Sequence, residues 1–225
     1  MSDKIDINES FKKSIQNKIE NINIDLSEVV LDSFFDENIL KEIPVIKSII
    51  SISKIGLDIK NYFLVNKLFK FLLELNSISV EDKKKFIAKL ENEKYRKKIF
   101  NYLLILIDKI ETEEKVIIMG KILKSMILED INIDEGFRLF NIIEKAYYDD
   151  LLALANRYGN NRIKFRSDVY WSDEIKVNLN SLGLLSPIYN IDTSDVKRLP
   201  FGNVKIEIRD YEITKFGRLL VKFGF

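Results

Sequence analysis

The chain contains neither cysteine nor histidine among its 225 residues. Without cysteine it has no disulfide, no thiolate nucleophile and none of the common zinc sites. Without histidine it has no Ser-His-Asp or Cys-His mechanism and no imidazole ligand for a metal. A catalyst would have to rely on carboxylates, lysine, tyrosine or a hard metal. We therefore expect a non-enzymatic protein that uses no cofactor.

Proline and glycine are also scarce, with 3 and 8 residues respectively. So few turn-forming residues favour long helices over a sandwich or barrel. The formal net charge is +1, so no global field attracts nucleic acid or an anionic membrane. The segment from Met1 to Glu9 is polar and acidic where a secretory signal needs a basic flank and an apolar run. We expect a cytoplasmic location.

Apolar residues recur with the period of amphipathic helices over most of the chain. We expect a marginal helix near 8–20, a short helix capped by Ser27, a second short helix that starts at Asp36-Glu37-Asn38, and helices over 44–55, 57–75, 80–91, 93–110, 113–128 and 134–156. Ser79 and Thr112 are expected N-caps, and Gly159-Asn160-Asn161 is expected to end the last of these helices in a left-handed turn. The pattern predicts an N-terminal tail or marginal helix at 1–25 and a multi-helix bundle at 26–158.

The pattern changes after Gly159. A helix is expected over 173–182, followed by two alternating strands over 184–191 and 204–213 with a loop between them, and then a helix capped by Thr214. This order predicts a small winged-helix-like α+β subdomain over residues 160–225. The fold class is therefore mainly α, with a helical bundle followed by this subdomain. Winged helices bind either DNA or proteins.

The charges of the winged helix favour a protein partner. A DNA-reading helix would place its N-terminus on the duplex, but here Asp173 and Glu174 lead that helix and repel phosphate. The candidate residues for an anionic partner are Arg162, Lys164, Arg166, Lys197, Arg198 and Lys205. The candidate interface aromatics are Tyr170 and Trp171, although Trp171 also suits the seam between the bundle and the wing.

Three other features have simpler explanations. Gly120-Lys121 lacks the spacing of a phosphate loop, so Gly120 is expected where another helix passes close. Asp149-Asp150 is the best carboxylate cluster, but adjacent helix positions point about 100° apart, and we expect a solvated face there. The lysine-bearing stripe over 43–75 suits a membrane surface as well as a bundle core, and we favour the core.

Two segments resemble the Abi-alpha family, a bacterial family of helical proteins named for phage abortive infection. The first runs from Ile43-Pro44-Val45-Ile46-Lys47 through Gly56 to Lys67-Leu68. The second combines Leu182-Gly183-Leu184-Leu185 with the segment from Tyr211 to Arg218. Together they cover about a third of the chain. The resemblance implies a cytoplasmic bacterial protein linked to phage defence or mobile elements, with no catalytic residues to carry over.

We therefore expect a protein that acts through protein–protein contacts, with another protein or with itself. A DNA-binding transcriptional regulator that uses the winged helix is the first alternative. A peripheral membrane protein that binds through residues 43–75 is the second.

Overall fold

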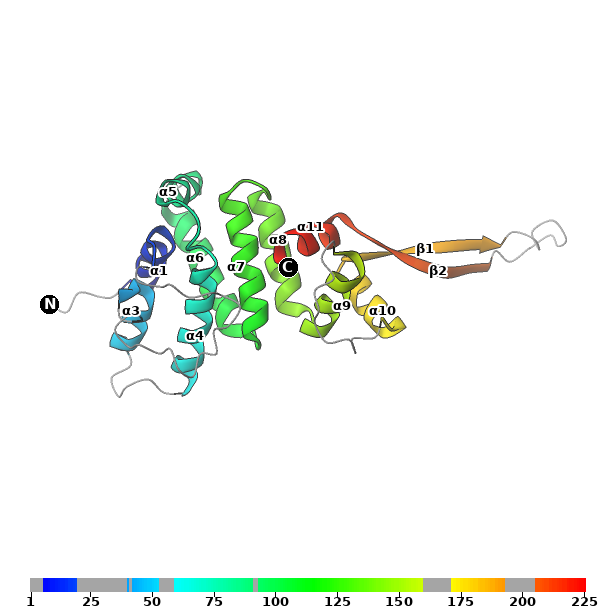
Figure 1. Ribbon diagram of the computed structural model, residues 1–225, viewed down its shortest axis with the longest axis horizontal. Coiled ribbons are helices and arrows are strands. Elements are labelled where there is room, and N and C mark those ends of the chain that lie inside the picture. Colours follow the sequence, from blue (N-terminus) through cyan, green and yellow to red (C-terminus); the bar gives the residue numbers. More distant parts are fainter. Residues whose placement is uncertain are drawn as a thin grey trace. The chain divides into compact units, whose positions relative to one another are not determined.

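A computed structural model describes residues 6–19, 40, 42–52, 59–90, 93–159, 171–192 and 205–225 (Figure 1). These residues form ten α-helices and one two-stranded antiparallel sheet, which confirms the mainly helical class. The chain divides into two compact units, residues 1–136 and 137–225. The short helix expected after Ser27 lies outside the described residues, as does the start of the one expected from Asp36-Glu37-Asn38.

The first unit holds the helices that the periodicity predicts before residue 130. They are α1 (Ile7–Gln16), α3 (Pro44–Ile52), α4 (Ile59–Leu73), α5 (Val80–Lys89), α6 (Glu93–Lys109) and α7 (Glu113–Ile127), followed by the first turn of α8 (Ile133–Lys145). The predicted caps are confirmed, since the side chains of Ser79 and Thr112 accept hydrogen bonds from the backbone N–H groups of Asp82 and Lys115. Local capping chemistry therefore sets where these helices begin.

The N-terminal helix α1 belongs to the core of the first unit. Phe11 is fully buried, and its ring centroid lies 6.1 Å from those of Phe71 on α4 and Phe100 on α6. The hydroxyl of Ser14 accepts a 2.9 Å hydrogen bond from the backbone N–H of Val45. The helix expected near 8–20 is thus a docked helix, and it ends earlier than expected, at Gln16, because Asn17 is extended.

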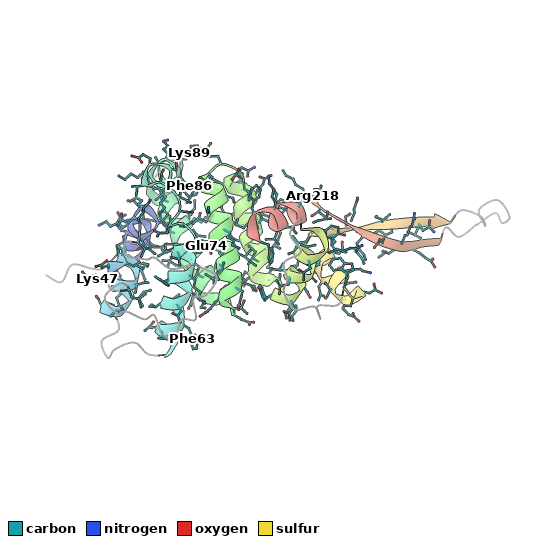
Figure 2. The ribbon with its side chains drawn as sticks, viewed as in Figure 1. Lys47, Phe63, Glu74, Phe86, Lys89 and Arg218 are labelled. Atoms are coloured by element: carbon teal, nitrogen blue, oxygen red, sulfur yellow. The ribbon has the colours of Figure 1, made fainter. Side chains whose placement is uncertain are left out.

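Gly120 marks a close crossing of α7 and α4, as the sequence predicts. A Cβ atom at Gly120 would lie 2.9 Å from the Cβ of Glu74 and 2.9 Å from the carbonyl oxygen of Phe71. Such distances are shorter than van der Waals contact, so only glycine lets the two helices approach this closely. The side chain of Glu74 is labelled in Figure 2.

The apolar stripe over 43–75 lies mainly in the core. Its buried members are Ile43, Val45, Ile46, Ile49, Val65, Leu68, Phe69, Phe71, Leu72, Leu73 and Leu75. Phe63 also stands at a position that fits the helical period of this stripe, but it is 55% exposed, and its ring makes an edge contact with Tyr62. Phe63 is labelled in Figure 2. Within the described part of the chain, no helix combines the length and apolar character of a membrane span.

The end of α7 contains a backbone conformation that suits glycine. Glu129 has φ +65°, and its N–H donates to the carbonyl of Met126, while the N–H of Asp130 donates to the carbonyl of Ser125. These two hydrogen bonds form a Schellman motif, whose left-handed position glycine fills best. The carboxylate of Glu129 pairs with Lys89, but both side chains are more than half exposed, and such ion pairs stabilise little.

We expect Glu129→Gly to raise the free energy of unfolding by about 1 kcal/mol, because it removes the strain of a side chain in the left-handed region. Urea denaturation followed by circular dichroism measures the change. Asp130→Gly is the matched control, since Asp130 has no positive φ and the substitution there should destabilise. A less stable Glu129→Gly protein would contradict this account.

The second unit contains the remainder of α8, α9 (Tyr148–Tyr158), α10 (Asp173–Ser181), the strands β1 (Leu185–Asp192) and β2 (Lys205–Ile213), and α11 (Lys215–Gly224). The single helix expected over 134–156 is wrong, because the chain breaks between α8 and α9. Tyr147 adopts an extended ψ of 139° there, and its side chain is 74% exposed. No glycine or proline marks the break. This unit includes most of α8 and all of α9, which the sequence groups with the bundle.

Gly159 itself does not adopt the expected left-handed conformation, and Asn160 and Asn161, the other two residues of the expected turn, lie outside the described residues. The φ of −75° and ψ of 148° at Gly159 are extended values that any residue adopts. The N–H of Gly159 still donates to the carbonyl of Ala155, so α9 ends where the sequence predicts. The helix and the two strands expected beyond it are confirmed to within one residue at each end, and the loop between the strands lies outside the described residues.

Candidate docking surface

The two strands form a ribbon, β1 paired with β2, whose register contains one bulge. Ile188 lies opposite Asp210 and Tyr189 lies opposite Ile208, so Arg209 has no partner. In a regular strand successive side chains alternate between faces, and one extra residue reverses that alternation. The plain alternation expected for the second strand is therefore wrong.

The bulge gathers the apolar residues of β2 on one side. They stand at positions 206, 208, 211 and 213, a spacing of two, three and two, so without a bulge the first pair would face away from the second. With it, three facing pairs share one face, namely Leu185 with Ile213, Pro187 with Tyr211, and Tyr189 with Ile208, and Ile206 continues that face. We call this side of the ribbon the apolar face. The other side bears Ser186, Ile188, Asn190, Glu207, Asp210 and Glu212.

The apolar face is buried at its base and open farther along. Leu185 is 2% exposed, whereas Tyr189 is 55%, Ile208 52% and Ile206 60% exposed. Four of the ten large apolar side chains that stand exposed in the described residues lie on the ribbon, counting Ile188 on its other side. A two-stranded ribbon is marginally stable alone in water, and contiguous exposed apolar side chains commonly mark a contact surface.

The base of the ribbon is fastened by the residues of the Leu-Gly-Leu-Leu and Thr-Lys-Phe-Gly segments. The hydroxyl of Thr214 donates to the carbonyl oxygens of Gly183 (2.7 Å) and Leu184 (3.2 Å), and it accepts from the N–H of Gly217 (3.1 Å). The N–H of Thr214 also donates to Leu184, at 3.0 Å. One threonine thus caps α11 and ties it to the start of β1. The two segments whose sequences suggest a winged helix therefore have a structural role, which is to hold the base of the ribbon.

The edges of the ribbon are poorly suited to accept another strand. Pro187 on β1 has no N–H to donate, and the bulge at Arg209 interrupts the edge of β2. Proline and bulges are common means of protecting strand edges from pairing. The face of the ribbon, and not its edges, is therefore the surface that can accept a partner.

Helix α10 lies beside the ribbon and presents an acidic start. Ser172 caps it by accepting from the N–H of Ile175, and a hydrogen bond from the Ser172 side chain lowers the pKa of Glu174. Lys176 is the only cation of α10, and its ammonium lies 2.9 Å from the carboxylate of Asp173. Two carboxylates and one ammonium leave this helix with a net charge of −1. That negative charge disfavours binding to the phosphate backbone of a nucleic acid.

The carboxylate cluster at the start of α9 has a structural contact. Asp150 is 6% exposed, and it accepts a 3.1 Å hydrogen bond from the side-chain amide of Asn178 on α10. Burial raises the pKa of Asp150, although the bond from Asn178 acts in the opposite direction. Within the described ranges no three carboxylates gather into a possible metal site. Asp150 therefore joins α9 to α10, while Asp149 is exposed.

Most of the candidate site residues from the sequence lie outside the described residues. These are Arg162, Lys164, Arg166, Tyr170, Lys197 and Arg198. Lys205 begins β2, opposite Asp192. Trp171 makes an edge-to-face contact with Tyr158, with ring centroids 6.0 Å apart. The hydroxyl of Tyr158 donates a hydrogen bond to the carbonyl of Tyr211, and burial raises the pKa of Tyr158. Trp171 therefore packs on a tyrosine that contacts the ribbon.

A basic surface on α11 was missed in the sequence. Lys215, Arg218 and Lys222 are all exposed, and their spacing of three and four residues aligns them along one side of the helix. Arg218 is labelled in Figure 2. Arg138 on α8 adds a fourth cation, with its guanidinium 4.7 Å from the ring centroid of Phe216. The spacing of the basic residues after Thr214 could have revealed this surface. In the same way, the spacing of two, three and two between the apolar residues of β2 could have revealed the bulge in the ribbon.

No protein-family model, curated protein or solved structure matches this chain.

Proposed function

We propose that this chain is a non-enzymatic protein that acts through protein–protein contacts, with the ribbon as its docking element. The observation that supports this proposal is the apolar face, on which Tyr189, Ile206 and Ile208 are each more than half exposed. The two protected edges direct the contact to that face. The surrounding charge, net −1 on α10, favours a protein over a nucleic acid.

We further propose that the second unit is a winged-helix-like module used for docking. The order α9, α10, β1, β2 and α11 supports this assignment, with α10 in the place of the recognition helix and the ribbon in the place of the wing. The resemblance to the Abi-alpha family adds a cellular setting to the proposal, namely the bacterial cytoplasm and phage defence.

A DNA-binding regulator is the alternative, and the basic surface of α11 is the observation that favours it. It predicts submicromolar binding to duplex DNA that weakens steeply with salt, because each neutralised phosphate releases counterions. The acidic start of α10 opposes this alternative. Membrane binding through residues 43–75 is opposed by the burial of their apolar side chains.

We expect a photo-crosslinking residue placed at Tyr189 or Ile206 to capture protein in living cells, because these positions lie on the exposed part of the apolar face. The same residue at Asn190, on the other side of the ribbon, is the matched control and should capture little. Mass spectrometry identifies the products, and a filter-binding assay with duplex DNA at about 150 mM salt runs in parallel. Equal capture from both sides, or tight DNA binding, would count against the proposal.

A further inference from the structure

A cavity of about 450 Å³ lies beside the C-terminal end of α1 in the first unit. Its apolar lining comes from the segment after α1 and from the starts of α3 and α5, through Ile19, Ile43, Pro44 and Val80. Small-molecule sites in proteins are commonly concave, of similar volume, and apolar with a few polar groups that orient the ligand. The size and lining of this cavity therefore suit a small organic molecule.

Hydrogen bonds between distant segments hold the walls of this cavity. The side-chain oxygen of Asn76, which follows α4, accepts a 2.8 Å bond from the N–H of Ile19, and the side-chain amide of Asn76 donates a 3.2 Å bond to the carbonyl of Ile19. Ser14 also lines the cavity, and its hydroxyl accepts a 2.9 Å bond from the N–H of Val45 on α3. The cavity is therefore preformed, which lowers the entropy cost of binding a ligand.

Two ammonium groups without a carboxylate partner belong to this region. Lys18 lines the cavity, and the ammonium of Lys83 lies 2.9 Å from the carbonyl oxygen of Asn17, another lining residue. Lys83 is 1% exposed, and lysine is rarely buried so fully unless an opposite charge accompanies it. Within the described residues neither lysine forms an ion pair, and the charge of Lys18 helps to lower the pKa of Lys83. An anion in the cavity would attract both ammonium groups and offset their mutual repulsion.

The one carboxylate in the described part of the lining, Glu42, narrows the class of anion. The ammonium groups of Lys18 and Lys83 together with this carboxylate leave a net charge of +1. That charge matches a single carboxylate better than the larger charge of a phosphate. A phosphate also has no apolar surface to cover the apolar lining. An apolar molecule that ends in a carboxylate satisfies both parts of the cavity.

We propose that this cavity binds a small apolar carboxylate, with its charged end toward Lys18 and Lys83 and its apolar body against Ile43 and Val80. The site uses no residue of the ribbon, so it extends the proposed function without depending on it. A short fatty acid and an apolar amino acid share this chemistry. They differ in the α-ammonium group of the amino acid, which Glu42 would attract.

Isothermal titration calorimetry of the full chain with hexanoate tests the proposal, at about pH 7 and constant ionic strength. We expect a dissociation constant below about 1 mM, and binding of inorganic phosphate that is at least about tenfold weaker. Lys83→Met and Lys18→Met should each weaken hexanoate binding about tenfold, because each removes a charge that attracts the carboxylate. Lys84→Met, at the exposed next residue of α5, is the matched control and should leave binding unchanged. Circular dichroism confirms that the variants are folded.

Glu42→Gln separates the two sources of the carboxylate. It should tighten hexanoate binding, because it removes a repulsion, and weaken leucine binding, because it removes the partner of the α-ammonium group. Tighter binding of leucine than of hexanoate by the wild type identifies an amino acid as the ligand, and the reverse order identifies a fatty acid. The proposal is overturned if neither acid binds, if phosphate binds as well as hexanoate, or if Lys83→Met binds both acids as tightly as the wild type.

Discussion

Replacing Gly217 by alanine is expected to destabilise the second unit by about 3 kcal/mol, at the upper end of the usual cost of overpacking. A Cβ atom there would lie 2.4 Å from the carbonyl oxygen of Leu184 and 2.6 Å from the Cγ1 of Ile213. The Leu184 oxygen already accepts two hydrogen bonds from Thr214, so it cannot move away without breaking the fastening of the ribbon. Hydrogen exchange of the amides in β1 and α11 measures the loss.

Gly183→Ala is the matched control for this experiment. Gly183 has φ +73° but no heavy atom within 4 Å of its added Cβ, so the substitution introduces backbone strain without a collision. We expect it to cost only about 1 kcal/mol. If Gly183→Ala proved the more damaging of the two, the close approach of α11 to Leu184 would not be what fastens the ribbon.

The second large effect concerns Lys83, which should make the first unit more stable in alkali. Its side chain is 1% exposed, and its ammonium donates a 2.9 Å hydrogen bond to the carbonyl of Asn17, the C-cap of α1. Burial lowers the pKa of Lys83 to about 8, and repulsion from Lys18 contributes in the same direction. At neutral pH the fold therefore holds a charge that would be better solvated in the unfolded chain.

The sign of the pH dependence follows from these pKa values. Between about pH 8 and the ordinary lysine value of 10.5, the unfolded state binds more protons than the folded state, so stability rises with pH. Below pH 8 the cost is fully present. We expect the stability of the wild type relative to Lys83→Met to increase by about 2 kcal/mol between pH 7 and pH 10.

Urea denaturation of the wild type and Lys83→Met across that pH range measures the difference. Lys84→Met is the control, since Lys84 is the next residue along α5 and is exposed. Comparing Lys83→Met with Lys84→Met removes the contribution of the other groups that titrate in alkali. A constant difference between the wild type and Lys83→Met would show that Lys83 keeps an ordinary pKa in the folded protein.

Local signals account for most of the fold that the sequence predicted. Ser79, Thr112 and Thr214 each cap a helix through their own side chain, and this chemistry involves only the next three residues. The break at Tyr147 had no such signal. An unbroken helix through residues 137–154 satisfies the 3.6-residue period equally well, so only packing could exclude it. The exposure of Phe63 shows the same limit of sequence reasoning. The 3.6-residue period identifies which residues form an apolar stripe, but not how much of that stripe other helices cover.

The candidate site was less accessible to sequence reasoning than the fold. The alternation of residues 206–213 identified a strand, but the bulge at Arg209 depends on pairing with β1, which lies across a connection of twelve residues. The basic surface of α11 could have been recognised from the spacing of Lys215, Arg218 and Lys222. The hydrogen-bond partner of Lys83 could not have been predicted from the sequence, because Asn17 stands 66 residues away in the chain.

The sequence by itself determined the helical class, the position of the strands and the absence of cysteine and histidine chemistry. These properties follow from composition and from periods of two and 3.6 residues, which each segment expresses alone. Only the tertiary structure decided which side of the ribbon is apolar, what fastens its base and which lysine is buried. Each of those depends on backbone atoms brought together from distant segments. The carbonyl oxygen of Leu184, which meets Thr214 and excludes any side chain at Gly217, is the clearest case.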